Sequence, residues 1–151
     1  MSAGNVKHTN QHAPRQRMFY YGGTATIEKG YVFCFDQDAT ENSTDPADRL
    51  GFTIEKPATA NLMFCAGVYS GNEGSFTGPG YITLNIPDRR QPVEAWTDAN
   101  MVLGASPLAP QDGEWGFGIH LDATVNLAMV AMAGVTENTD TTNALSTVYW
   151  L

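Results

Sequence analysis

The strongest constraint in this sequence is an alternation of apolar and polar side chains in short runs, separated by glycine and proline turns. Successive side chains of a β-strand point to opposite faces, so a period of two predicts strands. We find no convincing apolar stripe with the helical spacing i, i+3, i+4, i+7. The predicted strands cover residues 18–21, 24–27, 31–35, 50–54, 61–70, 81–86, 93–96, 101–103, 115–121, 125–133 and 144–151.

Short strands at intervals of about 8–12 residues are typical of a sandwich or a barrel. The chain has 151 residues, of which 42% are hydrophobic, and this is enough for the core of one domain. We therefore expect an all-β fold, a compact single-domain β-sandwich or β-barrel with an extended N-terminal arm. Residues 36–49 and 104–113 are expected to be loops, and the alanine-rich segment 125–133 has a helix as its alternative.

The first seventeen residues differ from all the others in charge. They contain three Lys and Arg, two histidines and no acid, whereas residues 18–151 hold the remaining 5 basic residues against all 16 acidic ones. The segment is also poor in apolar side chains, so it cannot bury enough surface to fold alone. We expect residues 1–17 to be a flexible basic arm on an acidic β-sandwich or barrel body, residues 18–151. The arm's contact residues are Lys7, His8, His12, Arg15 and Arg17.

The composition argues against several classes of partner. An acidic body lacks the basic footprint that binds phosphates, so we expect no direct contact with nucleic acid. No apolar run reaches the length of about 20 residues that spans a bilayer, and the N-terminus lacks the apolar core of a signal peptide. Charged residues make up only 16% of the chain, and such a surface is easily desolvated, which favours assembly. Cys34 and Cys65 lie in apolar strands and are expected to be reduced and buried, with a disulfide between them as the alternative.

The sequence carries no complete catalytic or metal-binding motif. His120 is the only histidine outside the arm, and with Asp122 it offers two members of a triad but no nucleophile elbow. The two cysteines and one body histidine are too few for the usual zinc spacings. We therefore predict no enzyme activity, no cofactor and no metal site, and we expect a solvated loop rather than a calcium site at the acidic residues of 36–49. These are Asp36, Asp38, Glu41, Asp45 and Asp48.

The aromatic residues leave a second kind of function open. Trp96, Trp115 and Trp150, with Phe76 and Tyr81, can stack on sugars if they are exposed together, although core packing is the commoner use of such rings. A carbohydrate-binding or fibre-attached β-module is therefore the alternative to an assembly protein.

Three stretches, in their order, resemble a known family. They read VYSGNEGSFTGPGYITLNIP from Val68, VEAWTDANMVLGASPLAP from Val93, and VAMAGVTENTDTTNALSTVYWL from Val130. With Lys29-Gly30-Tyr31-Val32 before them, they are similar to the capsid decoration, or cement, proteins of tailed bacteriophages. The matching elements are Gly80 to Leu84, Leu103 to Leu108 and Val130 to Leu151, so the resemblance covers residues 18–151.

The resemblance implies a structural virion protein without enzymatic activity. Such a protein is made in the host cytoplasm and assembles on the capsid exterior, often as a trimer and sometimes as a dimer. It would stabilise the capsid by bridging neighbouring major capsid protein subunits. An arm of seventeen residues, which can reach about 55 Å when extended, is suited to clasping an adjacent subunit.

Overall fold

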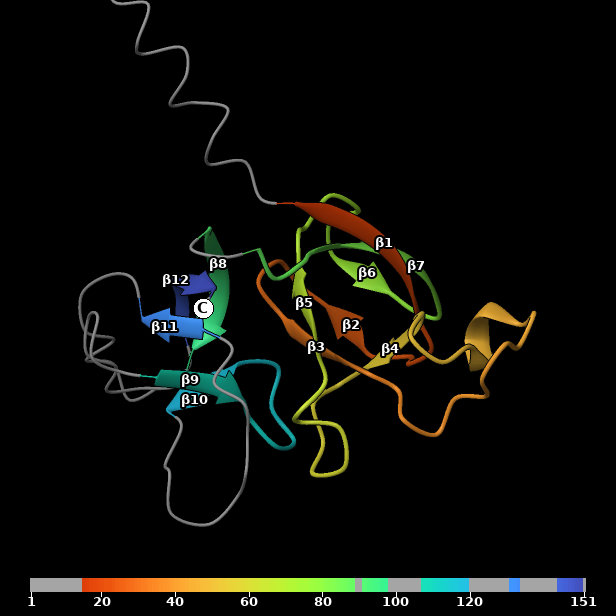
Figure 1. Cartoon of the computed structure of the whole chain (residues 1–151). Helices are drawn as coiled ribbons and strands as arrows, with labels where there is room; N and C mark the ends of the chain where they lie inside the picture. The colour runs from red at the N-terminus through yellow and green to blue at the C-terminus, as the bar shows by residue number, and fades with distance from the viewer. Residues whose placement is uncertain (1–14, 89–90, 98–106, 120–130, 134–143, 151) are drawn as a thin grey trace, which may run out of the picture.

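The computed structural model describes residues 15–88, 91–97, 107–119, 131–133 and 144–150, and these form an all-β fold (Figure 1). The expected fold class is confirmed. The strands are β1 Gln16–Tyr21, β2 Thr26–Ile27, β3 Val32–Phe35, β4 Thr53–Glu55, β5 Cys65–Tyr69, β6 Phe76–Thr77, β7 Gly80–Asn85, β8 Pro92–Thr97, β9 Pro107–Pro110, β10 Phe117–Ile119, β11 Ala131–Ala133 and β12 Ala144–Trp150.

The strands close into two barrels of five. The first barrel has the order β1-β4-β3-β5-β7 and the second has the order β10-β8-β12-β11-β9, while β2 and β6 form a separate two-stranded sheet. Closure leaves no open sheet edge in either ring. The two barrels lie side by side in Figure 1, with the C-terminus in the second.

The first barrel is filled mainly by aromatic rings. Its two longest strands, β1 and β7, pair in antiparallel register from Gln16 with Asn85 to Tyr21 with Gly80. Phe19, Tyr21 and Phe33 point inward, and the Phe33 ring lies 5.4 Å from that of Tyr21 in an edge-on arrangement. The buried members of this core are Phe19, Tyr21, Ile27, Phe33, Ile54, Ala66, Tyr69, Ile82 and Leu84.

The core of the second barrel includes two residues from strands of the first. Its buried cluster contains Val93, Ala95, Leu108, Phe117, Val148 and Trp150, and it also includes Val32 and Val68 from β3 and β5. Side chains alternate along a strand, so β3 sends Phe33 into the first barrel and Val32 toward the second. The β3–β5 pair therefore serves as a wall for both cores.

Backbone hydrogen bonds join the two barrels beside this wall. Val32 N donates to Trp115 O at 2.8 Å, and Trp96 N donates to Gly30 O at 2.8 Å. Gly30 has a φ of 91°, and a Cβ at this position would overlap the Leu145 side chain. Glycine is therefore required where the β2–β3 turn meets the second barrel.

Several boundaries differ from those expected. β5 begins only at Cys65, because buried Asn61 holds a turn: its side chain accepts from Ala58 N at 2.7 Å and donates to the Glu55 carboxylate at 2.7 Å. The segment 104–113, expected to be a connection, contains β9, whose prolines stand at the two ends of the strand where a missing N–H is tolerated. The acidic loop contains a short 3-10 helix, Pro46–Asp48.

The first barrel also begins earlier than expected. β1 starts at Gln16, and Arg17 pairs with Leu84, so both residues belong to the first barrel rather than to an arm ending at residue 17. Arg15 is tied down as well, because its carbonyl accepts a hydrogen bond from Ile86 N at 2.9 Å. The predicted strand 101–103 and residues 125–130 of the predicted strand 125–133 lie outside the described residues.

Candidate interaction surface

The outer side of the β1–β7 pair carries large apolar side chains that face solvent. Met18 stands opposite Thr83, and Tyr20 stands opposite Tyr81. Their neighbours Phe19 and Ile82 occupy the barrel core, so the alternation sends Met18 and Tyr81 outward, where they are 56% and 48% exposed. The strand pattern that fills the core thus also creates an apolar surface.

Aromatic contacts connect this strand pair to the turn before β4. The Tyr81 ring lies 5.4 Å from Tyr20 and 6.1 Å from Phe52, and Phe52 in turn lies 6.4 Å from buried Phe19. Leu50, in the same turn, is 43% exposed. Rings fixed by neighbouring rings lose little side-chain entropy on binding, which suits them to an interface.

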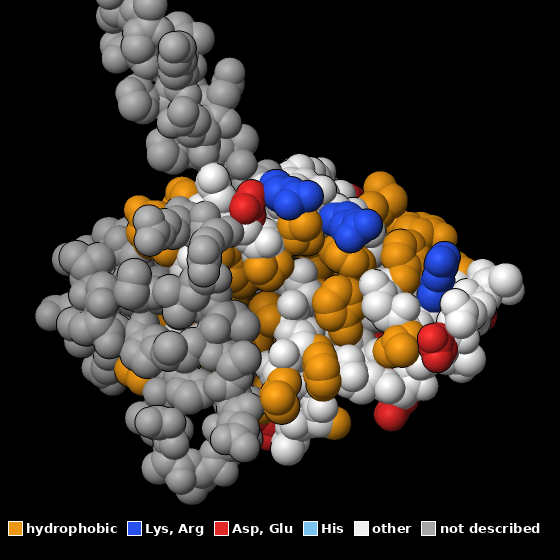
Figure 2. Space-filling view, in the orientation of Figure 1, with side chains coloured by type: hydrophobic (Ala, Val, Ile, Leu, Met, Phe, Trp, Pro, Cys, Tyr) orange, Lys and Arg blue, Asp and Glu red, His pale blue; other side chains and the backbone are white. Residues whose placement is uncertain are grey.

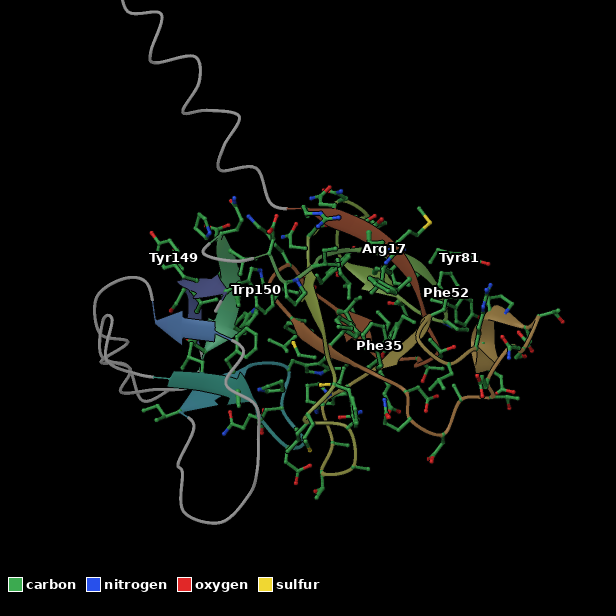
Figure 3. All side chains as sticks on the ribbon, in the orientation of Figure 1. Arg17, Phe35, Phe52, Tyr81, Tyr149 and Trp150 are labelled. Carbon is green, nitrogen blue, oxygen red and sulfur yellow. The ribbon has the colours of Figure 1, made fainter. Side chains whose placement is uncertain are left out.

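Two arginines stand beside these apolar groups. The Arg49 guanidinium lies 5.9 Å from the centre of the Phe52 ring, and Arg17 and Arg49 line a hollow of about 290 Å³ together with Met18 and Leu50. In Figure 2, Lys and Arg side chains lie among hydrophobic side chains on this part of the molecule, and Figure 3 places Arg17, Phe52 and Tyr81 near one another beside β1 and β7. We call this surface the arginine–aromatic face: Arg17, Met18, Tyr20, Arg49, Leu50, Phe52 and Tyr81.

Both arginines are available to a partner. The one ion pair within the described residues joins Lys29 to Glu94, so neither Arg17 nor Arg49 forms one with a described carboxylate. Both residues are exposed. A guanidinium beside an aromatic ring is weakly hydrated and accepts a carboxylate in bidentate geometry, so the face favours an acidic and partly apolar partner.

The predicted contact residues of the arm fall into two groups. Arg17 is part of the arginine–aromatic face, and Arg15 lies just before β1. Lys7, His8 and His12 lie outside the described residues, as do His120 and Asp122. Arg49 was not among the predicted contact residues, because it stands at the end of the acidic loop. Its only signal was its position directly before the apolar residues Leu50 and Phe52.

A larger hollow, of about 660 Å³, is lined by β4 and by Asp36, Lys56 and Trp115 among others. Burial raises the pKa of Glu55, while its hydrogen bond from Asn61 lowers it. The Trp115 ring stacks on Tyr31 at 5.1 Å and has the Lys56 ammonium 5.3 Å from its centre. Trp115 is thus contacted by Tyr31 and Lys56, and it also lines this hollow.

The other two tryptophans are also engaged. Trp150 is buried against Phe117 at 5.8 Å, as core packing predicts. Trp96 is half-buried, contacts Tyr31 at 5.9 Å and donates its indole N–H to the Lys29 carbonyl at 3.0 Å. Trp96 and Trp115 are thus held on the same tyrosine at the junction of the barrels.

The acidic side chains of loop 36–49 stabilise the loop itself. Asp36 accepts from Asp38 N at 2.9 Å, Asp45 accepts from Ala47 N at 2.9 Å, and Asp48 accepts from Thr40 N at 3.1 Å. Within the described part of the chain, no three His, Cys, Asp or Glu side chains are placed to hold a metal ion together. The same residues include no helix long and apolar enough to cross a membrane.

No protein-family model matches this chain, and no curated protein matches it. The residues and the geometry of the arginine–aromatic face are therefore what indicates a function for this chain.

Proposed function

We propose that this chain is a structural protein of a tailed-phage particle, without enzymatic activity, that decorates the capsid exterior after synthesis in the host cytoplasm. It would stabilise the shell by bridging neighbouring major capsid protein subunits. The observation that carries the proposal is the arginine–aromatic face, an exposed apolar surface with two arginines that lack a described carboxylate partner.

The chemistry of the face supports a protein partner. Aromatic, methionine and arginine side chains are enriched at protein interfaces, and arginine and tyrosine are frequent hot spots. When a partner covers the exposed side chains of Met18 and Tyr81, their apolar surface is removed from contact with water, which favours binding. Arg17 and Arg49 would pair with carboxylates on the partner. The partner surface is therefore expected to be apolar with an acidic rim.

The place of residues 1–14 in the sequence, just before β1, supports bridging. β1 begins at Gln16, and Arg17 belongs to the face, so residues 1–14 continue directly from the proposed contact surface. A segment of this length reaches about 45–50 Å when extended. The face can thus sit on one capsid subunit while Lys7, His8 and His12 contact a neighbouring subunit, or another copy of this chain in a trimer or dimer.

Repetition on a lattice supports binding through modest contacts. Ordering the arm costs conformational entropy, which must be offset by the contacts that it makes. Once the face is bound, the arm binds at a high effective concentration, so two weak contacts act together. No direct contact with nucleic acid is needed for this function.

Sedimentation of particles tests the proposal. Phage particles are produced in cells that carry the genome encoding this chain. They are purified on a density gradient and analysed by mass spectrometry. We expect the chain in the capsid band in a fixed ratio to the major capsid protein, and its absence from that band would refute the proposal.

Deletion of residues 2–14 tests the role of the arm. This truncation retains Arg15, Gln16 and Arg17 and with them the β1–β7 pairing, so the body is expected to fold as in the full chain. We expect weaker occupancy on the particles and a loss of part of the salt sensitivity, because Lys7 is removed. Unchanged occupancy would show that the arm has no role in capsid binding and that the arginine–aromatic face is the only contact.

A further inference from the structure

The two cysteines of the chain lie directly opposite each other on adjacent antiparallel strands. Cys34 in β3 is the register partner of Cys65 in β5. Phe35 N donates to Phe64 O at 2.8 Å, which joins the residue after Cys34 to the residue before Cys65. This bond identifies the two cysteines as a non-hydrogen-bonded pair of the ladder.

A non-hydrogen-bonded pair brings two side chains close enough for a covalent bond. Its Cα atoms are about 4.5 Å apart, whereas disulfides join Cα atoms at about 4.4–6.8 Å. The register shifts between Phe33 and Cys34, since Phe33 pairs with Gly67 and Cys34 with Cys65. Ala66 is thus an extra residue, a β-bulge, which lets Cys65 share the face of Cys34 instead of falling out of phase.

The environments of the two thiols differ. Cys34 is fully buried, whereas Cys65 is half-buried and packs against the core cluster shared with the second barrel. Burial raises the pKa of both thiols, and the nearby Cys65 and Glu55 raise that of Cys34 further. Both thiols are free in the structure, and Cys34 is buried as expected, whereas Cys65 was expected to be buried and is not. A small reagent would therefore reach Cys65 first.

We propose that Cys34 and Cys65 form a redox-active dithiol that closes to a cross-strand disulfide between β3 and β5, with a low-molecular-weight disulfide as oxidant. The Cys65 thiolate attacks the small disulfide, forms a mixed disulfide and releases one small thiol. Cys34 then loses its proton and attacks the Cys65 sulfur, which releases the second small thiol. In total, two protein thiols are oxidised to one disulfide and one small disulfide is reduced to two thiols.

The location gives this bond a structural consequence. β3 and β5 are the strands that contribute to both cores, through Phe33 and Tyr69 on one side and through Val32 and Val68 on the other. A bond between them closes a loop of about thirty residues and restricts the unfolded chain. We expect the thermal midpoint of the oxidised protein to rise by about 10 °C. This inference is independent of the capsid proposal, because it concerns the barrel wall alone.

The test treats the folded full-length chain with 4,4′-dithiodipyridine, an aromatic disulfide whose released thione absorbs light. We expect two thiones per chain, a final mass lower by two hydrogen atoms, and a Cys34–Cys65 cross-linked peptide after non-reducing digestion. The matched variant Cys34→Ala keeps the half-buried Cys65 thiol, so it should release one thione and retain the pyridyl adduct on Cys65.

Three outcomes would overturn the proposal. A persistent pyridyl adduct on wild-type Cys65 would mean that Cys34 cannot reach it, and a disulfide-linked dimer would mean that Cys65 reacts between chains. No reaction until denaturant is added would mean that the pair is closed to small disulfides. Thermal unfolding of the oxidised and reduced forms, with Cys34→Ala/Cys65→Ala as the unresponsive control, measures the shift independently.

Discussion

The two barrels have equal strand numbers but differ in how they complete their cores. The first barrel buries rings from its own strands, such as Phe19, Tyr21 and Phe33. The second combines one pair of rings, Phe117 and Trp150, with small aliphatic side chains and needs two valines from the wall of the first. The dependence is therefore unequal, because the second core includes two fully buried valines of the first barrel, whereas the first core is contacted from the β9–β10 connection by the half-buried ring of Trp115.

This difference assigns separate roles to the two halves. The first barrel carries the arginine–aromatic face and the cysteine pair, and its ring-filled core holds the strands on which those groups stand. The second barrel is expected to fold only against the β3–β5 wall. A change in the first core should therefore reach both barrels, whereas a change in the second should remain local.

Truncation of one large ring in each core should give the largest effects. Phe33→Ala and Trp150→Ala each remove a fully buried ring, and such changes cost about 3–5 kcal/mol. We expect Phe33→Ala to lower hydrogen-exchange protection in both barrels and Trp150→Ala to lower it only in the strands of the second barrel, β8 to β12. Equal loss of protection throughout the chain in both variants would show that the two barrels unfold as one cooperative unit. It would disprove the unequal dependence of the two cores.

Alkaline pH should act on the first barrel. Burial raises the pKa of Tyr69 from 10.0 to about 12, and the nearby Glu73 adds to the shift. Because the pKa of Tyr69 is higher in the folded state than in the unfolded state, neutral Tyr69 contributes to the free energy of unfolding below pH 10. This contribution is lost as the pH rises toward 12. We expect roughly 2 kcal/mol of stability to disappear over this interval.

Tyr69→Phe provides the control for that titration. The variant loses the hydrogen bond from the Tyr69 hydroxyl to Gly74 O, 2.8 Å long, so it should be about 1 kcal/mol less stable at neutral pH. Its unfolding free energy, measured in urea, should then fall less between pH 10 and 12 than that of the wild type. Parallel curves would show that Tyr69 does not titrate in this way.

The ion pair between the barrels should contribute least. Lys29 and Glu94 connect the β2–β3 turn to β8, but both side chains are about half exposed and well screened by water. We expect Lys29→Ala, Glu94→Ala and the double variant each to cost less than about 1 kcal/mol. A coupling energy above that value in the double-mutant cycle would contradict this expectation. It would show that the ion pair, rather than Val32, Val68 and the backbone hydrogen bonds, holds the two barrels together.

Much of the fold follows from local pattern. The alternation in 144–150, with Val148 and Trp150 on one face and Thr147 and Tyr149 on the other, agrees with the burial observed in β12, because a strand with one buried face must keep that period. The closure into two rings does not follow from it. β4 stands between β1 and β3 and pairs in parallel with β1 through Tyr20 and Thr53, which is a non-local choice that no short window contains.

The candidate site was predictable only in part. Arg17 drew notice as a basic residue, but its place in β1 depends on pairing with Leu84, 67 positions later. Tyr20 and Tyr81 meet only in the observed register, and Arg49 joins them through the turn before β4. The pairing of Cys34 with Cys65 likewise requires the bulge at Ala66, because without it the cysteines would fall out of phase.

Occupancy on purified capsids tests the central claim most directly. Arg17→Ala/Arg49→Ala removes the charge of the face, and Lys29→Ala/Lys56→Ala removes the same net charge elsewhere on the body. We predict that the first variant binds particles at least about tenfold more weakly than the wild type, and that the second binds within about twofold. Equal binding by wild type and both variants, or no binding by the wild-type chain, would contradict the account.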